Sequence, residues 1–341
     1  MSYTENDRLN DTLETRPKDR VPVIAGTILW AASNFPHASY EEIVSDPDLI
    51  TAAQLWAKDL LGFDLLYPTP DNCFISEAFG CRIRYTQTGP IVDALPLSLE
   101  NISEIENLHF PNPGEDGRFP MIREAAQKLF KESGGTVPIV ANIEGPFTSL
   151  CRVIEVELIL RMMLKKPRIV DKLLDKMNRL LIEFAKALVK IGVNCISLPE
   201  PTASATMISP RMFRKFVLPH IREFTNQLDI PVLLHICGDT TPILDAMGES
   251  GADILSLDQC MDLAKARTLV PEKVIAGNVD PVASLLMGDI ETVEQDALHC
   301  LKTMGIERFI LMPGCGLPPD APADNIRAMA RVAADYGLGR Q

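Results

Sequence analysis

The chain lacks several features that would place it in common functional classes. Its longest apolar runs fall far short of the roughly 20 residues that a membrane-spanning helix needs. Its polar N-terminus, MSYTENDRLNDTLETRPKDR, resembles neither a secretory signal nor a typical transit peptide. Basic residues are in deficit, with 33 Lys and Arg against 46 Asp and Glu and a net charge of −13. These absences predict a cytoplasmic protein that has no membrane partner and no general affinity for nucleic acid.

Paired cysteine motifs are also missing. The chain has eight cysteines, and none of them forms a CxxC pair. In a chain of 341 residues without a signal peptide, scattered cysteines are typical of reduced thiols rather than of a disulfide framework. A few of them could bind a metal ion.

What the sequence does contain is a repeating order of short apolar strands and amphipathic helices. Strands that are apolar throughout are typical of a parallel sheet covered by helices on its faces. The eight predicted strands are residues 21–26, 63–68, 138–143, 193–198, 231–237, 252–258, 273–279 and 308–313. Eight strands with crossover helices favour an α/β fold of the (β/α)8 TIM-barrel type. An open doubly wound sheet is the alternative, but no glycine-rich dinucleotide loop follows the first strand.

Two additions to the barrel are expected, and residues 1–341 are expected to form one domain. Residues 1–20 have the pattern of an N-terminal helix. Residues 80–97 alternate in polarity and turn at Thr88-Gly89-Pro90, which predicts a β-hairpin inserted between the second strand and its helix.

Polar residues gather where the predicted strands end, which is the edge where TIM-barrel enzymes place their chemistry. His235 and Cys237 end the fifth strand and Cys315 follows the eighth. The other polar residues at strand ends are Asp71, Asn142, Glu144, Glu200, Asp258, Asn278 and Asp280.

His235, Cys237 and Cys315 form the candidate metal site. Alternate residues of a strand project to the same side, so His235 and Cys237 face one way, and closure of the barrel brings Cys315 toward them. One imidazole and two thiolates suit zinc, and three protein ligands with an open fourth position are typical of a catalytic zinc site. Asp258 is placed to supply a weak oxygen ligand when no substrate is bound. The alternative is that these cysteines only pack, since cysteine often behaves as a small buried hydrophobe.

Nearly the whole chain resembles the uroporphyrinogen decarboxylase superfamily, and within it the zinc-dependent methylcobamide:thiol methyltransferases. The matching stretches are FDLLYPTPDNCFISEAFGCRIRY, IEGPFTSL, ISLPEPTASATMISPRMFRKFVLPHI, LLHICGDTTPIL, GADILSLDQ, VIAGNVDP and FILMPGCGLPPDAPADNI. The resemblance implies a (β/α)8 barrel. It also implies a zinc site made by His235, Cys237 and Cys315, with Asp258 as an acidic residue that yields to the substrate.

The resemblance further implies the reaction. Zinc would hold a small acceptor thiol as thiolate, and the thiolate would take a methyl group from a methylated corrinoid such as methylcobalamin. Coenzyme M is the usual acceptor of this branch, and homocysteine or another small thiol suits the same chemistry. A corrinoid protein is the expected methyl-donor partner, because no segment of this chain resembles a cobalamin-binding domain.

Three alternatives stay open. The decarboxylase branch is the first, but its arginine-rich segment after the first strand is replaced here by AGTILWAASNFPHASY, which has no arginine. Arg152 stands where the decarboxylases have an active-site tyrosine, whereas Asp71 matches their pyrrole-binding aspartate. The second alternative is a methylcorrinoid methyltransferase with a folate acceptor, and the third is a corrinoid or tetrapyrrole binder without catalysis.

The remaining site residues divide into two groups. The candidate catalytic residues are Asp258, Glu144 and Asp71. The candidate cofactor-binding residues are Asn142, Glu200 and Asn278. Arg152 and Arg211 could meet an anionic acceptor, although a surface ion pair is the usual role of such a residue.

Overall fold

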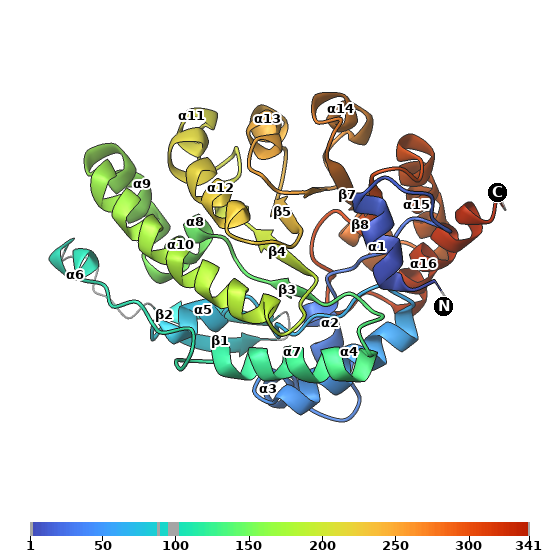
Figure 1. Ribbon diagram of the computed structural model, residues 1–341, viewed down its shortest axis with the longest axis horizontal. Helices are drawn as coiled ribbons and strands as arrows, with labels where there is room; N and C mark the ends of the chain where they lie inside the picture. Colours follow the sequence, from blue (N-terminus) through green and yellow to red (C-terminus); the bar gives the residue numbers. More distant parts are fainter. Residues whose placement is uncertain (1–2, 87–88, 95–101, 340–341) are drawn as a thin grey trace.

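The computed structural model describes residues 3–86, 89–94 and 102–339. At its centre a parallel sheet of six strands curls around itself, with the strands in chain order (Figure 1). These strands are β3 (Val140–Asn142), β4 (Cys195–Pro199), β5 (Val232–Ile236), β6 (Ile254–Leu257), β7 (Val274–Val279) and β8 (Phe309–Pro313). The α/β class and the last six predicted strands are confirmed, and the fold is TIM-barrel-like.

The prediction of regular strands at residues 21–26 and 63–68 is wrong. Each segment forms one isolated parallel bridge, and the bridges are Val23–Leu311 and Leu66–Ile139. A backbone hydrogen bond from Asp64 N to Val23 O, 3.0 Å long, joins the two segments to each other. Together these contacts connect β8 to β3 through the two irregular segments.

The irregularity of the first segment has a local cause. Pro22 has no N–H to donate to a neighbouring strand. The next N–H, that of Val23, donates instead to the side chain of Asp64 at 2.7 Å. The buried Asp64 carboxylate also pairs with Arg8 and Arg20, at 2.9 and 2.7 Å. Side-chain hydrogen bonds therefore replace part of the backbone ladder here.

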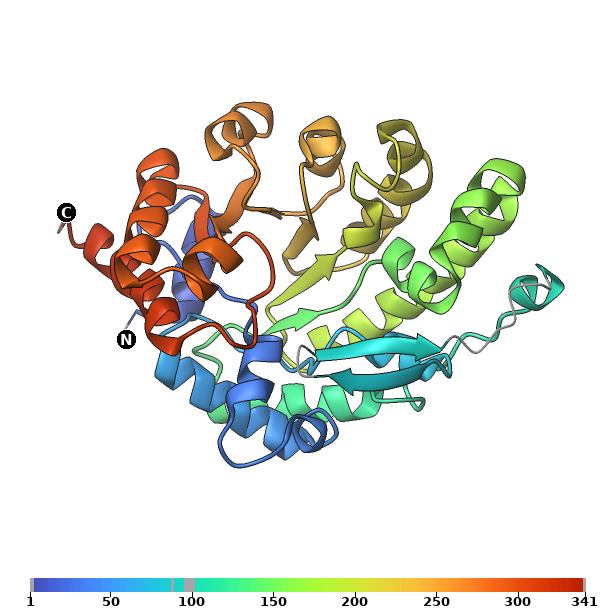
Figure 2. The same ribbon diagram turned by 180° about the vertical axis from the view of Figure 1, so that it is seen from behind.

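The described residues form helices, most of which lie around the outer side of the sheet, as both ribbon views show (Figures 1 and 2). They are α1 (Glu5–Leu13), α2 (Thr27–Asn34), α3 (Tyr40–Ile43), α4 (Pro47–Leu61), α5 (Phe74–Ala78), α6 (Ile102–Glu106), α7 (Phe119–Ser133), α8 (Pro146–Val153), α9 (Val156–Lys165), α10 (Pro167–Val189), α11 (Pro210–Met212), α12 (Leu218–Asn226), α13 (Leu244–Gly248), α14 (Leu263–Leu269), α15 (Ile290–Met304) and α16 (Ala323–Gly337). No described helix is long and apolar enough to cross a membrane.

The strands bury side chains on both faces, in two separate apolar clusters. In β5, Leu234 and Ile236 belong to the large cluster between sheet and helices, whereas Leu233 belongs to a smaller cluster inside the curled sheet. Because side chains alternate along a strand, His235 shares the inward face of Leu233. This alternation directs the imidazole into the interior of the curled sheet.

The two predicted additions are present in shorter form. The N-terminal helix α1 covers Glu5–Leu13 rather than all of residues 1–20, and its Leu9 packs into the inner cluster. The hairpin consists of β1 (Arg82–Thr86) and β2 (Gly89–Ala94), which pair antiparallel. Residues 87–88 and 95–97, which include part of the predicted turn, lie outside the described residues.

Candidate metal centre and cavity

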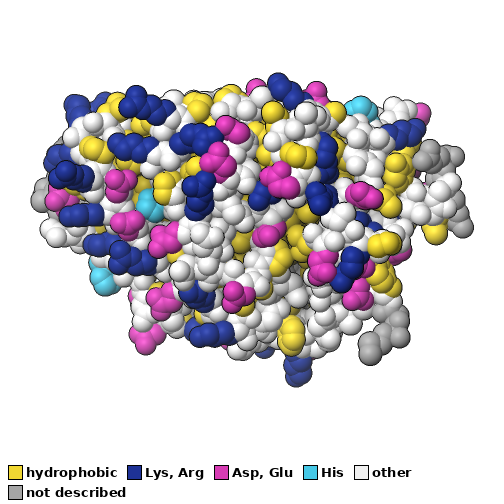
Figure 3. Space-filling view, turned by 45° about the horizontal axis from the view of Figure 1, so that its top comes forward, with side chains coloured by type: hydrophobic (Ala, Val, Ile, Leu, Met, Phe, Trp, Pro, Cys, Tyr) yellow, Lys and Arg dark blue, Asp and Glu magenta, His cyan; other side chains and the backbone are white. Residues whose placement is uncertain are grey.

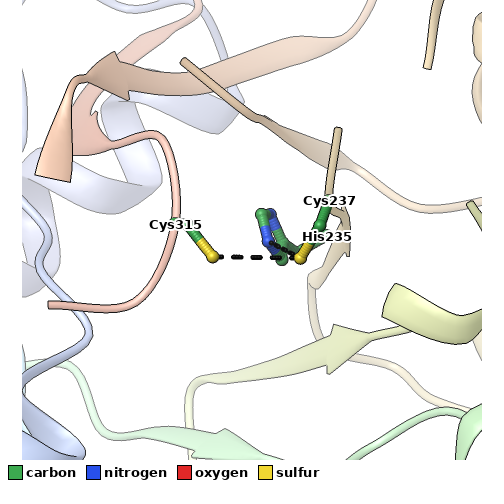
Figure 4. A group of neighbouring side chains, drawn as sticks. All are labelled: His235, Cys237 and Cys315. Atoms are coloured by element: carbon green, nitrogen blue, oxygen red, sulfur yellow. Dashed lines mark hydrogen bonds between the residues drawn. The ribbon is translucent and has the colours of Figure 1, made fainter. Parts of the chain in front are cut away.

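The three predicted zinc ligands lie together. Cys237 Sγ is 3.3 Å from His235 Nε2 and 3.8 Å from Cys315 Sγ. One ligand atom from each residue lies within 4.8 Å of the other two. Figure 4 shows the sulfur atoms of Cys237 and Cys315 pointing toward each other from the end of β5 and from the loop after β8. Residues nearly eighty positions apart in the sequence therefore form one group of donor atoms.

Ser256 fixes the orientation of the imidazole. It pairs with His235 in the register of β5 and β6, and its Oγ lies 3.0 Å from His235 Nδ1. The same hydroxyl donates toward Met312 Sδ at 3.7 Å. With the hydroxyl proton directed at sulfur, Ser256 Oγ accepts from Nδ1–H. This assigns the lone pair of the ring to Nε2, the atom that faces the thiols.

The two thiols share a hydrogen bond that separates their pKa values. As acceptor of this bond, Cys315 has a lowered pKa. The pKa of Cys237, the donor, is raised by the same bond first and by burial second. One of the two sulfurs is thus predisposed to carry negative charge, as a thiolate ligand must.

The loop after β8 owes its path to Gly314. A Cβ at this position would overlap the backbone of Gln259, so a side chain cannot be placed there without a backbone shift. Gly314 N also donates to Val279 O at 2.8 Å, which ties the loop to the end of β7. The loop directs Cys315 toward Cys237.

Asp258 lies beside this group of donors but is not a member of it. Its Oδ2 accepts from Gly238 N at 2.8 Å and its Oδ1 accepts from Cys260 N at 3.1 Å. It therefore holds the turn that follows Cys237. Asn278 supports the same region from β7, because its Nδ2 donates to Asp258 O at 3.0 Å. The role of Asp258 as an oxygen ligand stays a prediction.

The donor group opens into a cavity of about 200 Å³. The described residues that line it are Gly26, Ile28, Leu29, Tyr67, Asn72, Asn142, Glu144, Arg152, Ser197, Pro199, Pro201, His235, Cys237, Met312, Cys315, Gly316 and Leu317. Of the predicted candidates, Asn142 and Glu144 belong to this lining. Asn142 Nδ2 donates to Asn72 Oδ1 at 2.7 Å. A cavity of this size suits a small ligand, because drug-sized ligands usually occupy about 300–1,000 Å³.

Glu144 and Arg152 are oppositely charged residues in the lining. Glu144 is 1% exposed, and its Oε2 lies 2.7 Å from Arg152 Nε. The contact is an ion pair without hydrogen-bond alignment, and neither carboxylate oxygen has a hydrogen-bond partner among the described residues. Burial raises the pKa of Glu144 to about 7, although the charge of Arg152 opposes the shift. Glu144 is thus a buried carboxylate with unused acceptor capacity.

Glu200 has a structural position behind the cavity. Its carboxylate accepts from Phe147 N at 3.0 Å and from Thr148 N at 2.8 Å, in the first turn of α8. Burial raises its pKa to about 7 despite these hydrogen bonds. A Cβ on Gly145 would overlap this carboxylate, so the glycine makes room for it.

Asp71, a third candidate catalytic residue, does not line the cavity. Its two oxygens meet Arg118 at 2.6 and 3.1 Å, and it has no exposed surface. Arg118 also contacts Glu77 of α5 at 2.5 Å. This network ties the start of α7 to the segment before α5.

Several residues of the site were not found from the sequence or were ranked low. Ser256 had a detectable signal, because it is a polar residue in the otherwise apolar strand ILSL. Arg152, for which both contact with an anionic acceptor and a surface ion pair were open, lines the cavity. Asn72 and Tyr67 gave no signal, since they belong to an irregular segment. Arg211 is exposed and is not part of the lining.

A second group of possible metal ligands lies elsewhere. Asp175 of α10 and the residues His220 and Glu223 of α12 have ligand atoms within 4.8 Å of one another. Asp175 and Glu223 are at least partly exposed, and these helices lie outside the sheet. Figure 3 shows that acidic and basic side chains are interspersed on one face of the molecule. An acidic pair beside a histidine is an ordinary feature of such a surface.

Comparison with known families and proteins gives a consistent result. The family model described as uroporphyrinogen decarboxylase (URO-D) matches residues 4–336. The methylcobamide:CoM methyltransferase MtbA of Methanosarcina mazei is 30% identical, and the match covers 98% of each chain. The uroporphyrinogen decarboxylase of Geobacter metallireducens is 28% identical, over 94% of this chain and 96% of the relative.

A solved structure is also closely similar. A methyltransferase from Methanosarcina mazei superposes with a TM-score of 0.90 at 27% sequence identity. The match covers 98% of this chain and 99% of that chain. Similarity thus extends over the strands, the hairpin and the loops that build the cavity.

Proposed function

This chain belongs to the uroporphyrinogen decarboxylase (URO-D) family, and we propose that it transfers a methyl group from a methylated corrinoid to a small thiol. The relatives named as methylcobamide:CoM methyltransferases support the reaction class. The observation that carries the proposal is the meeting of His235, Cys237 and Cys315 at the wall of a small cavity.

The donor set fits zinc. One imidazole nitrogen and two sulfurs are the ligand types of catalytic zinc sites with three protein ligands. Nε2 of His235 is free for a metal because Ser256 occupies Nδ1, and one thiol is already predisposed to ionise. When bound, zinc supplies the positive charge that keeps a thiol deprotonated near neutral pH, where a free thiol is mostly protonated.

The protein residues have separate tasks in this proposal. His235, Cys237 and Cys315 would hold the metal, and Ser256 orients the imidazole. Asp258 holds the turn after Cys237, and its carboxylate would be a further oxygen ligand while no acceptor is bound. Asn142 and the apolar lining residues enclose the acceptor and exclude water from it. Glu200 and Asn278 act by positioning α8 and the loop after β6.

The methyl transfer itself is a displacement. The acceptor sulfur forms a bond to the methyl carbon while the carbon–cobalt bond breaks. The electron pair of that bond stays on cobalt, and the product is a thioether. The corrinoid is a substrate here, and we propose that a separate corrinoid protein presents it at the cavity opening. The acceptor class includes coenzyme M, which the names of the relatives support.

Decarboxylation of uroporphyrinogen is the second candidate, because decarboxylases are among the relatives. A substrate with many carboxylates needs several cations around it. Arg152 is the one arginine or lysine among the described lining residues, so the cavity offers a single cation to such a substrate. These features favour methyl transfer over decarboxylation.

The test is a direct assay of the zinc-loaded protein with methylcobalamin and a panel of small thiols. We expect thiol-dependent loss of methylcobalamin, read from the cobalamin spectrum, together with formation of the thioether. The Cys315→Ala variant should lose this activity, whereas Cys260→Ala, which removes an exposed thiol, should keep it. Release of CO2 from uroporphyrinogen without zinc would favour the decarboxylase. Transfer only to a folate, or corrinoid binding without transfer, would support the other two alternatives.

A further inference from the structure

The cavity contains the ion pair of Glu144 and Arg152, and several polar atoms of this pair have no hydrogen-bond partner among the described residues. Glu144 is almost fully buried, yet both of its carboxylate oxygens lack hydrogen-bond partners among the described residues. A buried carboxylate without donors is costly, and a ligand that donates hydrogen bonds to it removes that cost. Nε of Arg152 lies 2.7 Å from Glu144 Oε2 but is not aligned for a hydrogen bond to it. Both partners can therefore bind a ligand.

The charges around this pair favour a cation near Glu144. Glu200 and Asp71 both act electrostatically on Glu144, in the direction that disfavours its negative charge. The nearby Arg118 is already matched by Asp71 and Glu77. A ligand that carried only an anionic group would add negative charge beside this group of carboxylates. A ligand with an ammonium group would compensate it.

The strand register gives the separation between this pair and the metal ligands. Gly145 N donates to Pro199 O at 2.9 Å, and Pro199 pairs with His235 in the register of β4 and β5. Glu144 and His235 therefore stand at the same level, two strands apart. Two strand spacings amount to roughly 10 Å between the backbones. A short ligand can reach from one side chain to the other across the cavity.

We propose that the acceptor is a small amino-acid thiol, in which an ammonium group meets Glu144 and a carboxylate meets Arg152 while the sulfur reaches His235, Cys237 and Cys315. Such a ligand carries one charge of each sign, so it leaves the net charge of the cavity unchanged. Each of its charged ends gains a partner of opposite charge. Coenzyme M, by contrast, has a sulfonate for Arg152 but no group that donates to Glu144. This inference rests on the proposed function, since it names the acceptor class for that site.

The experiment compares four thiols on the zinc-loaded protein by calorimetry, which needs no methyl transfer. Homocysteine carries both charges, coenzyme M an anion only, cysteamine a cation only, and 2-mercaptoethanol neither. We expect homocysteine to bind at least about tenfold more tightly than any of the other three, because hydrogen bonds to charged groups are the strong ones. Homocysteine binding no tighter than 2-mercaptoethanol would overturn the proposal.

Substitutions test which side chain binds each charged end of the ligand. Glu144→Gln should weaken the binding of homocysteine and of cysteamine about tenfold or more, and it should not weaken the binding of coenzyme M. Arg152→Gln should weaken the binding of homocysteine and of coenzyme M, and it should not weaken the binding of cysteamine. If Arg152→Gln does not fold, the double variant Glu144→Gln/Arg152→Gln removes both charges and should bind all four thiols with similar affinity. An equal loss for all four thiols in Glu144→Gln would reveal a structural role only and contradict the proposal.

A matched control and an independent assay complete the design. Glu157 and Arg161 form an exposed ion pair on α9, so Glu157→Gln and Arg161→Gln should leave all four affinities unchanged. If the binding order holds but no thiol demethylates methylcobalamin, the proposed function fails and the ligand assignment stands. If all four thiols are methylated with the same KM, the proposed function stands and the ligand assignment fails.

Discussion

Ser256 Oγ lies 3.0 Å from His235 Nδ1, on the side of the imidazole opposite the two thiols. The hydroxyl is fully buried and pairs across β5 and β6, so it holds the ring in one orientation. A partner of this kind fixes the tautomer of a metal-binding histidine and raises its basicity. The contact links the register of two strands to the direction of a ligand atom.

Removal of this hydroxyl should weaken metal binding without removing a ligand. We expect Ser256→Ala to lower zinc affinity about 10–100-fold, because Nδ1 loses its acceptor and the ring loses its orientation. Competition with a chromophoric chelator measures the affinity. Ser197→Ala removes a hydroxyl from a residue of the cavity lining and should have a much smaller effect. Equal losses in the two variants would contradict the role of Ser256.

The pair of Asp71 and Arg118 should contribute to stability rather than to catalysis. Asp71 is fully buried, so Arg118→Met leaves an unpaired buried carboxylate. We expect the free energy of unfolding to fall by about 3–5 kcal/mol, as is usual for a broken buried ion pair. Chemical denaturation measures the change.

An exposed ion pair gives the comparison. Arg161→Met removes a pair with Glu157 on the surface of α9 and should change stability by less than about 1 kcal/mol. A similar small change in Arg118→Met would show that the Asp71 network is dispensable for folding, and it would reopen a catalytic role for Asp71.

Glu200 should make stability depend on pH in a specific direction. Burial raises its pKa to about 7 in the folded chain, from an ordinary value of 4.5. Between these values the folded state binds more protons than the unfolded state, so the contribution of Glu200 falls as pH rises from about 4.5 to about 7. Relative to the wild type, Glu200→Gln should therefore gain stability over this interval and show no further gain above it.

The measurement is the difference in unfolding free energy between the two proteins at several pH values. Glu132→Gln removes a charge from an exposed position of α7 and controls for the change in net charge. A difference that rises toward low pH would reverse the expected sign and contradict the assignment of a raised pKa to Glu200.

The sequence predicted the grouping of His235, Cys237 and Cys315 for a definite physical reason. His235 and Cys237 are two residues apart at the end of a strand, and strand periodicity alone places them on one side. The position of Cys315 followed from the way parallel strands return to a common edge. Both inferences depend on regular geometry, which apolar patterns such as PVLLHIC and RFILMP specify.

Other features depend on contacts that no local pattern encodes. The pairing of Asp71 with Arg118 joins residues 47 positions apart through an irregular segment. The first two predicted strands have suitable apolar patterns, but at Val23 the carboxylate of Asp64 takes the place of a backbone acceptor. The roles of Glu144 and Glu200 differ because of what surrounds each carboxylate, although both follow a strand in the same way. Periodicity predicts where such a residue lies but not which partner it finds.

The measurement that tests the central claim most directly is the zinc content of the purified chain and of its cysteine variants. The account predicts one zinc ion per chain in the wild type and in Cys260→Ala, and its loss in Cys315→Ala with the fold retained by circular dichroism. Full zinc content in Cys315→Ala would contradict the claim that these three side chains form the metal site.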